Sequence, residues 1–328
     1  QGLAAVAKNN DSAVAEQAFV RALDIAPTFK APRVALARIQ MLSGDLAQAA
    51  LLLGEHIGKA PHDYRAYLAL AEVYRTLKKP AKQGGVYRQL LDLSPNNADV
   101  LALLAEHDMS LKKYGKAVES FKRLLNKAPN NRFALAGITR ANFALNFFKK
   151  AAETAKKLVA NQPNSQNYQL LGMSLFYSGS YDQAALAFEA ALKITPNDHA
   201  LWGKLGDSYR LDSNEKQTAA YQKATELAMH SEQNQAADSR TLAALSYYLV
   251  SLGKTALAVH YLNRISVRDD GQSQFSSGLA YARLGDIHRA LAHLRYATYK
   301  GFAKGLIRHH PLLGQLKQDS RFATWLAQ

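Results

Sequence analysis

Six of the nine prolines in this chain of 328 residues follow a single interval. They are Pro27, Pro61, Pro95, Pro129, Pro163 and Pro196, and the intervals are 34, 34, 34, 34 and 33 residues. Each of these prolines follows an apolar run. Proline cannot continue a helix, and it biases the residue before it away from helical angles. The sequence therefore predicts a repeating unit of about 34 residues in which each proline marks the end of a helix.

Between the prolines, small and large apolar residues recur at fixed offsets. One repeat carries Tyr168, Leu171, Gly172, Leu175, Ala184, Phe188, Ala191 and Pro196, and the next begins with Trp202, Leu205, Gly206 and Tyr209. A small pair such as Gly172 and Ala184 lets the two antiparallel helices of one hairpin cross closely, while Tyr168 and Phe188 fill the space between hairpins. This order resembles the pattern of tetratricopeptide repeats (TPR), in which each repeat is a helical hairpin.

The resemblance covers nearly the whole chain, and it implies an all-α, right-handed superhelical solenoid of about eight to nine hairpins with a C-terminal capping segment. Full repeats are expected at residues 30–63, 64–97, 98–131, 132–164 and 165–198, followed by an irregular repeat at 199–238 and two more at 239–270 and 271–301. The array, residues 1–301, opens with a partial repeat. Its glycine column would fall at Leu3, so we expect the chain to be a fragment or mature form of a longer protein.

Residues 302–328 depart from the repeat. A solenoid exposes an apolar face at its last hairpin, so we expect this segment to be the cap that covers it. The order Gly301, Phe302, Leu313, Leu316, Asp319, Phe322 resembles the closing part of TPR domains in bacterial sensor and regulator chains.

The residues offer no basis for an enzyme. The chain has no cysteine, which excludes disulfides, thiolate metal sites and cysteine nucleophiles. Its ten histidines lack metal-binding spacing: His309 and His310 are adjacent, and His288 lies five residues before His293. No phosphate-binding loop or catalytic triad can be argued. We therefore expect a non-catalytic protein that has no metal, no cofactor and no small-molecule substrate.

Charge and compartment are less constrained. The formal net charge is +15, which bears on solubility and on anionic partners but not on fold. No run approaches the ~20 apolar residues that cross a bilayer. The absence of cysteine is compatible with an oxidising compartment, so a periplasmic or membrane-associated place in a bacterium is favoured over the cytoplasm.

Basic residues form a ladder on the second helices of three repeats, which in this family line the convex side. Lys82, Lys116 and Lys150 lie 34 residues apart, as do Arg88, Lys122 and Lys156, and Arg123 and Lys157 extend the rows. We call these eight residues the basic ridge. The ridge is either a solvated face that keeps the array monomeric or a dock for a polyanion. The rows contain no interleaved aromatic residues, which argues against base stacking.

The concave groove is read from the first helices, where TPR groove residues lie one or two places from the packing columns. This offset gives Arg65, Glu72, Arg75, Asp99, Glu106, Met109, Phe133, Arg140, Phe143, Gln169, Met173, Phe176, Tyr177, Asp207, Arg210 and Tyr247. Eight of them form the predicted partner site: Arg65, Arg75, Phe133, Arg140, Phe143, Met173, Phe176 and Tyr177. Aromatic residues, methionine and arginine are typical interface anchors. The alternative is that some of these aromatic side chains turn inward as hairpin packing.

Together these patterns predict a scaffold that binds a partner protein or peptide in the groove. The alternative is a module that binds an acidic polysaccharide, an anionic lipid or a nucleic acid on the basic ridge, as a sensor or assembly domain of a larger bacterial protein. The two differ in salt dependence, because affinity for a polyanion falls steeply with salt.

Overall fold

The computed structural model describes residues 12–26, 30–233, 238–266 and 268–327, and this part of the chain is helical with no β-strand. The long helices are α2 (Ser12–Ile25), α3 (Lys30–Ser43), α4 (Leu46–Lys59), α5 (Tyr64–Thr76), α6 (Pro80–Leu93), α7 (Ala98–Ser110), α8 (Tyr114–Lys127), α9 (Arg132–Ala144), α10 (Phe148–Asn161), α11 (Ser165–Ser178), α12 (Tyr181–Ile194), α13 (His199–Leu211), α14 (Gln217–Gln233), α15 (Ser239–Ser251), α16 (Thr255–Leu262), α17 (Gly271–Arg283) and α18 (Ile287–Tyr299). Short elements follow: α19 (Lys304–His309), two 3₁₀ turns at Pro311–Leu313 and Leu316–Gln318, and α20 (Ser320–Ala327).

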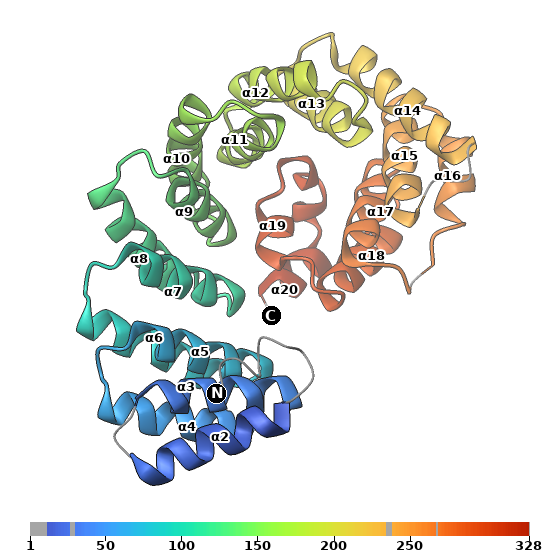
Figure 1. The fold of residues 1–328 in the computed structure, drawn as a ribbon. Helices are drawn as coiled ribbons and strands as arrows, with labels where there is room; N and C mark the ends of the chain where they lie inside the picture. Colours follow the sequence, from blue (N-terminus) through green and yellow to red (C-terminus); the bar gives the residue numbers. More distant parts are fainter. Residues whose placement is uncertain (1–11, 27–29, 234–237, 267, 328) are drawn as a thin grey trace. The chain divides into compact units, whose positions relative to one another are not determined.

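From α3 onward the helices pair as consecutive hairpins, α3 with α4 through α17 with α18 (Figure 1). The all-α hairpin architecture predicted from the proline interval is therefore confirmed. The irregular repeat has a physical counterpart, because its polar stretch extends the second helix α14 to Gln233. The predicted glycine column at Leu3 and the proline at Pro27 lie outside the described residues.

The prolines end second helices, and the polar residues after them begin the next first helix. Pro95, for example, directly follows Ser94, the residue that terminates α6. Two residues later the Asn97 side chain accepts hydrogen bonds from the amides of Asp99 and Val100 at the start of α7. Such caps satisfy helix amides that have no partner inside the helix. One short polar motif thus stops one repeat and starts another.

The turn inside each hairpin contains a residue in the left-handed region. These residues are Gly44, Lys78, Lys112, Asn146, Gly179, Ser213, Gly253 and Gly285, with φ between 54° and 88°. The first four lie 34 residues apart, so the turn keeps its conformation even where the sequence supplies lysine.

Glycine at helix crossings permits close packing, as the sequence pattern predicts. A Cβ atom added at Gly172 in α11 would lie 2.6 Å from a ring carbon of Phe188 in α12. In the α13–α14 hairpin Gly206 faces the Tyr221 ring, and in the α17–α18 hairpin Gly278 faces Leu294. A larger residue at these positions forces either the ring or the helix to move.

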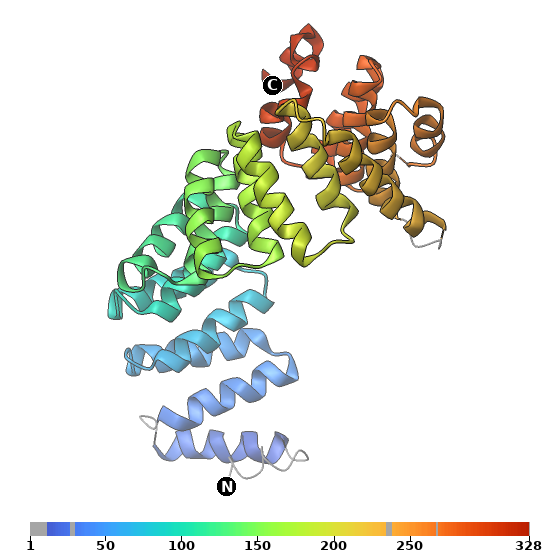
Figure 2. The ribbon, with the colours of Figure 1, turned by 90° about the horizontal axis from the view of Figure 1, so that it is seen from above.

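The chain divides into two compact units, Gln1–Pro129 and Asn130–Gln328. In unit 1, hairpins α3 to α8 follow α2 in chain order, and Figure 2 shows them as a stack from dark blue to teal. In unit 2, α15 packs directly on α17, so the first helices of these two hairpins are neighbours. Each described helix is too short or too polar to cross a lipid bilayer.

The C-terminal segment, residues 302–327, folds back onto the first helices of unit 2 (Figure 1). Its side chains Ile307, Leu313, Leu316 and Phe322 are buried in the core that also contains Leu294. Phe302 stacks on Phe275 of α17, with ring centroids 4.3 Å apart. The segment therefore completes the core of the last hairpins, and it also extends toward α10 and α11, as described below.

Candidate binding site

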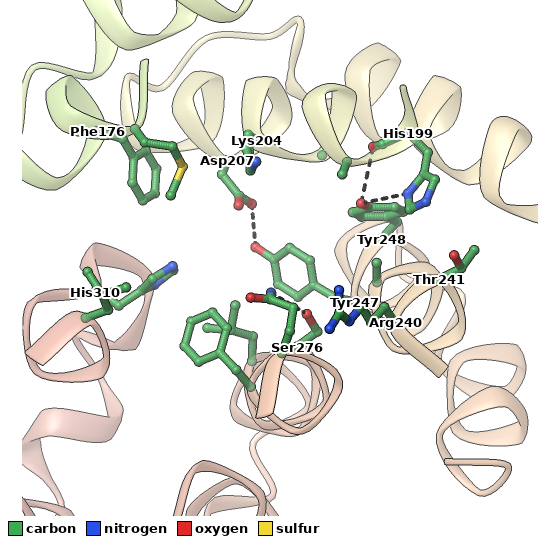
Figure 3. A pocket seen from close by; sticks show the side chains of 18 of the residues that line it. Phe176, His199, Lys204, Asp207, Arg240, Thr241, Tyr247, Tyr248, Ser276 and His310 are labelled. Carbon is green, nitrogen blue, oxygen red and sulfur yellow. Dashed lines mark hydrogen bonds between the residues drawn. The ribbon is translucent and has the colours of Figure 1, made fainter. Parts of the chain in front are cut away.

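A pocket of about 530 Å³ lies on the inner side of unit 2, among the first helices α11, α13, α15 and α17 and the C-terminal segment (Figure 3). Its apolar walls come from aromatic rings, including Phe176 of α11, Tyr248 of α15, Phe275 of α17 and Phe302. Concave, largely apolar pockets of this size are typical of ligand-binding sites.

Asp207 of α13 is a polar group of the pocket that two tyrosine hydroxyls hold in place. One carboxylate oxygen, Oδ1, accepts hydrogen bonds from the hydroxyls of Tyr221 (2.7 Å) and Tyr247 (2.6 Å). Burial raises the pKa of Asp207 to about 6, although the two hydroxyls and the positive charges of Arg210 and Arg283 act in the opposite direction. The other oxygen, Oδ2, makes no hydrogen bond to a described residue, so it is available to a ligand.

Lys204 lies one helical turn before Asp207 and supplies the pocket with an ammonium group (Figure 3). Burial lowers the pKa of Lys204, while Asp198 and Asp207 raise it. The ammonium forms no hydrogen bond or ion pair with any residue that the structure describes. A partly desolvated ammonium without a partner gains most when a hydrogen-bond acceptor enters the site.

Two further polar side chains of the pocket are already held by hydrogen bonds. The Tyr248 hydroxyl donates to the backbone oxygen of His199 at 3.2 Å and lies 3.3 Å from its Nδ1. The Arg240 Nε donates to Asp270 at 3.1 Å. The pocket thus combines polar side chains held by hydrogen bonds, apolar walls and the Lys204 ammonium, which has no partner among the described residues.

His310 of the C-terminal segment closes one side of the pocket (Figure 3). Its ring centroid lies 5.7 Å from that of Phe176, 5.5 Å from Tyr177 and 5.2 Å from Phe275. Burial lowers the pKa of His310 to about 3, so the imidazole is neutral at physiological pH, and Nδ1 has no hydrogen-bond partner. Next to it, His309 lies edge-on to Phe148.

The predicted groove residues divide into three groups. Met173, Phe176 and Tyr177 line the pocket, and the last two are buried with 4% and 8% of their surface exposed. Phe143 packs on Phe148 and Tyr177, next to the pocket but not in its lining. These aromatic side chains therefore serve partly as packing, which is the alternative that the sequence left open.

The remaining predicted groove residues lie outside the pocket. Phe133 has 37% of its surface exposed, and Arg140 is exposed. In unit 1, Arg65 and Arg75 are exposed, and the Arg75 Nε donates to Glu72 at 2.8 Å. None of these four residues lines the pocket of unit 2.

The eight basic-ridge residues are all exposed and lie on second helices. In unit 1 these are Lys82 and Arg88 of α6 and Lys116, Lys122 and Arg123 of α8; in unit 2 they are Lys150, Lys156 and Lys157 of α10. Within the described residues none pairs with a carboxylate. Lys82 and Lys150 lie over the rings of Tyr74 and Phe147.

The groove offset in the sequence predicts Asp207 and Tyr247 as site residues, but it does not predict Lys204, Tyr248 or the contribution of the C-terminal segment. Lys204 stands one turn from an offset position and is an unusual charge on an inner helix face, which is a usable signal. The role of His310 depends on where the C-terminal segment folds, and no spacing in the sequence encodes that.

Tetratricopeptide repeat profiles match residues 34–98 and 166–198. No curated protein sequence matches the chain at a significant level. Among solved structures, a tetratricopeptide repeat protein from Parabacteroides merdae superposes with a TM-score of 0.53 at 17% identity, over 88% of this chain and 98% of that one.

Two further structures resemble parts of the chain. MamA protein gives a TM-score of 0.49 at 21% identity, over 52% of this chain and 95% of its own. YrrB, described as a TPR protein with an unusual peptide-binding site, gives a TM-score of 0.47 at 16% identity, over 57% of this chain and 96% of its own. At 17% identity the likeness to the Parabacteroides merdae protein concerns the fold alone.

Proposed function

This chain belongs to the tetratricopeptide-repeat proteins, and on that premise we propose that it is a non-catalytic interaction scaffold that holds a segment of a partner protein in the pocket of unit 2. Repeat solenoids bind partners on the surfaces that their stacked first helices create. The observation that carries the proposal is the apolar pocket of about 530 Å³ on that surface, lined in part by Met173, Phe176 and Tyr177.

The chemistry of the pocket defines the segment that it suits. The aromatic walls favour a bulky apolar side chain as an anchor, which contributes on the order of 2 kcal/mol or more when fully enclosed. The Lys204 ammonium favours a carbonyl or carboxylate oxygen next to that anchor, and Asp207 Oδ2 can accept an N–H from the same segment. An extended peptide offers both groups on its backbone.

Selection of peptides from a random displayed library on the purified chain tests this proposal. Ser276→Trp would fill the pocket from α17, and the matched control Arg295→Trp adds the same side chain at an exposed position on α18. Selected peptides should lose at least tenfold in affinity with Ser276→Trp and little with Arg295→Trp. Peptides that bind both variants equally well would overturn the assignment of the pocket.

The basic ridge supports a second candidate, binding of a polyanion. The supporting observation is that its eight exposed cations have no carboxylate partner among the described residues. Such binding would weaken steeply with salt, whereas a peptide held by an apolar pocket would be much less sensitive.

A further inference from the structure

A second pocket, of about 330 Å³, lies where α13 and α17 end and α16 begins, and residues 312–316 of the C-terminal segment close it. It shares Tyr247 and Leu279 with the larger pocket. Two arginines line it, Arg210 in the last turn of α13 and Arg283 in the last turn of α17. Both are half-buried. We call it the arginine pocket.

The two arginines of this pocket have no direct partner among the described residues. Neither guanidinium forms an ion pair or a hydrogen bond with a residue in the described ranges, and the Nε of Arg283 is buried without a partner. Asp207 is near enough for both arginines to lower its pKa, but it forms no ion pair with either. Its Oδ1 is taken by two tyrosine hydroxyls instead.

A structural role at the helix ends does not account for the two arginines. Basic side chains in the last turn of a helix stabilise it by donating to the unpaired carbonyl groups there. Elsewhere in unit 2 such a bond occurs: Arg308 donates to the backbone oxygen of Leu326, which lies in the last turn of α20. Arg210 and Arg283 make no such bond. A buried N–H without a partner in a native structure calls for a ligand, ion or water.

We propose that the arginine pocket binds an oxyanion, a carboxylate or phosphate group, between the guanidinium groups of Arg210 and Arg283. The planar fork of a guanidinium matches the paired oxygens of both groups, and an anion there would give the Arg283 Nε its missing acceptor. Thr255 and Gln315, which also line the pocket, offer a hydroxyl and an amide as further donors. The anion is either a free small molecule or an acidic side chain of a bound protein, and the proposal does not depend on the peptide site of the larger pocket.

The test is thermal unfolding and calorimetric titration of the whole chain with sodium phosphate and with sodium glutarate, against sodium chloride at equal ionic strength. The parent should show a saturable rise in Tm with phosphate or glutarate and none with chloride. Arg210→Gln and Arg283→Gln should each weaken binding of the effective anion at least tenfold. Arg295→Gln, an exposed control in α18, should bind as the parent does.

A second titration, with a short peptide of alternating Asp and Gly, distinguishes the two sources of the anion. Binding of this peptide at least tenfold tighter than glutarate identifies a protein side chain as the source, and the reverse order identifies a free anion.

A second readout separates binding from a structural role. Without added anion, Arg283→Gln should lose little or no stability, because removal of a buried guanidinium without a partner and of one of two like charges offsets the lost attraction to Asp207. A structural role predicts that both glutamine variants are less stable and that anions stabilise the variants and the parent equally. That result would overturn the proposal, as would a parent that shows no saturable response to phosphate, glutarate or the peptide. Circular dichroism confirms that each variant is folded, and either variant alone suffices for the comparison.

Discussion

The imidazole of His310 lies edge-on to the ring of Tyr177, with centroids 5.5 Å apart and planes at 81°. One residue belongs to the C-terminal segment and the other to α11, so the contact joins the end of the chain to a hairpin from the middle of the sequence. Edge-to-face pairs of this kind stabilise beyond the burial of their area. The C-terminal segment is therefore tied to the inner side of unit 2 as well as to its last hairpin.

The first prediction concerns pH. The pKa of His310 is lowered by burial from 6.5 to about 3, so the folded protein keeps this group neutral where the unfolded chain protonates it. The stability that it contributes is present above pH 6.5 and is lost as pH falls toward 3. Between pH 6.5 and 4.5 the loss is about 2–3 kcal/mol. Urea unfolding at both pH values should show a smaller pH dependence for His310→Leu than for the parent.

The control for this experiment is Leu313→Ala. It removes a fully buried side chain of the same segment without a titratable group, so it should lower stability by a similar amount at both pH values. If His310→Leu keeps the pH dependence of the parent, the imidazole is not held neutral in the fold.

A second prediction concerns removal of residues 302–328. This deletion uncovers Leu279, Leu291 and Leu294, and it also removes the ring contacts of His310 with α11. Each buried large apolar side chain that is lost corresponds to about 1.5–3 kcal/mol. The truncated chain should melt at lower temperature and self-associate. Hydrogen exchange in α11 should increase as well, and unchanged exchange there would mean that the segment covers only the last hairpin.

Much of the fold could be predicted from the sequence because it is encoded locally and repeatedly. A proline such as Pro95 ends a helix by its own geometry, and Gly172 fits only where two helices cross closely. The left-handed turns could not be predicted in every repeat. Lysine does not favour the left-handed region, so the residue type at Lys78 and Lys112 does not predict the turn. The packing of the hairpin imposes the left-handed conformation there.

The site was less predictable, for a different physical reason. The groove offset identified Met173, Phe176 and Tyr177 as lining residues but not their degree of burial. That burial depends on contacts with the C-terminal segment, which are long-range and have no period. Lys204 was missed because a single charge on an inner face does not show whether anything pairs with it.

The third prediction tests the crossing glycines. Gly172→Ala places a methyl group 2.6 Å from a ring carbon of Phe188, so it should destabilise unit 2 by about 1–3 kcal/mol. The control is Gly85→Ala in α6, where an added Cβ meets nothing within 4 Å. There the higher helix propensity of alanine should raise stability by about 0.5–1 kcal/mol. Chemical unfolding followed by circular dichroism measures both, and equal effects would argue against the close crossing.

A fourth prediction concerns Lys112, which has φ 57° in the turn between α7 and α8. A left-handed conformation costs about 1 kcal/mol for a residue with a Cβ atom, and glycine avoids that cost. Lys112→Gly should therefore raise the free energy of unfolding by up to about 1 kcal/mol. Lys122→Gly, at an exposed position inside α8, should instead lower it, because glycine disfavours a helix interior. A stability gain from both changes would point to charge and not to backbone conformation.

The last prediction decides the role of the basic ridge. Lys116 and Lys122 of α8 and Lys150 and Lys156 of α10 are exposed and lack carboxylate partners among the described residues. If the ridge binds polyanions, reversing these four to glutamate should abolish retention on heparin and on anionic vesicles. The salt dependence of binding should fall too, because each cation that contacts an anionic group of the polymer releases counterions.

Net charge alone also affects retention, so the control variant must change the net charge by the same amount as the ridge variant. Lys59, Lys79, Lys193 and Lys254 are exposed lysines outside the ridge, and their reversal to glutamate alters the net charge by the same amount. Ridge binding predicts that this control elutes near the parent while the ridge variant is not retained. Equal loss in both variants means that the +15 charge acts as a diffuse field. Full retention of the ridge variant means that the lysines only keep a solvated face charged, and it leaves the pocket of unit 2 as the proposed partner site.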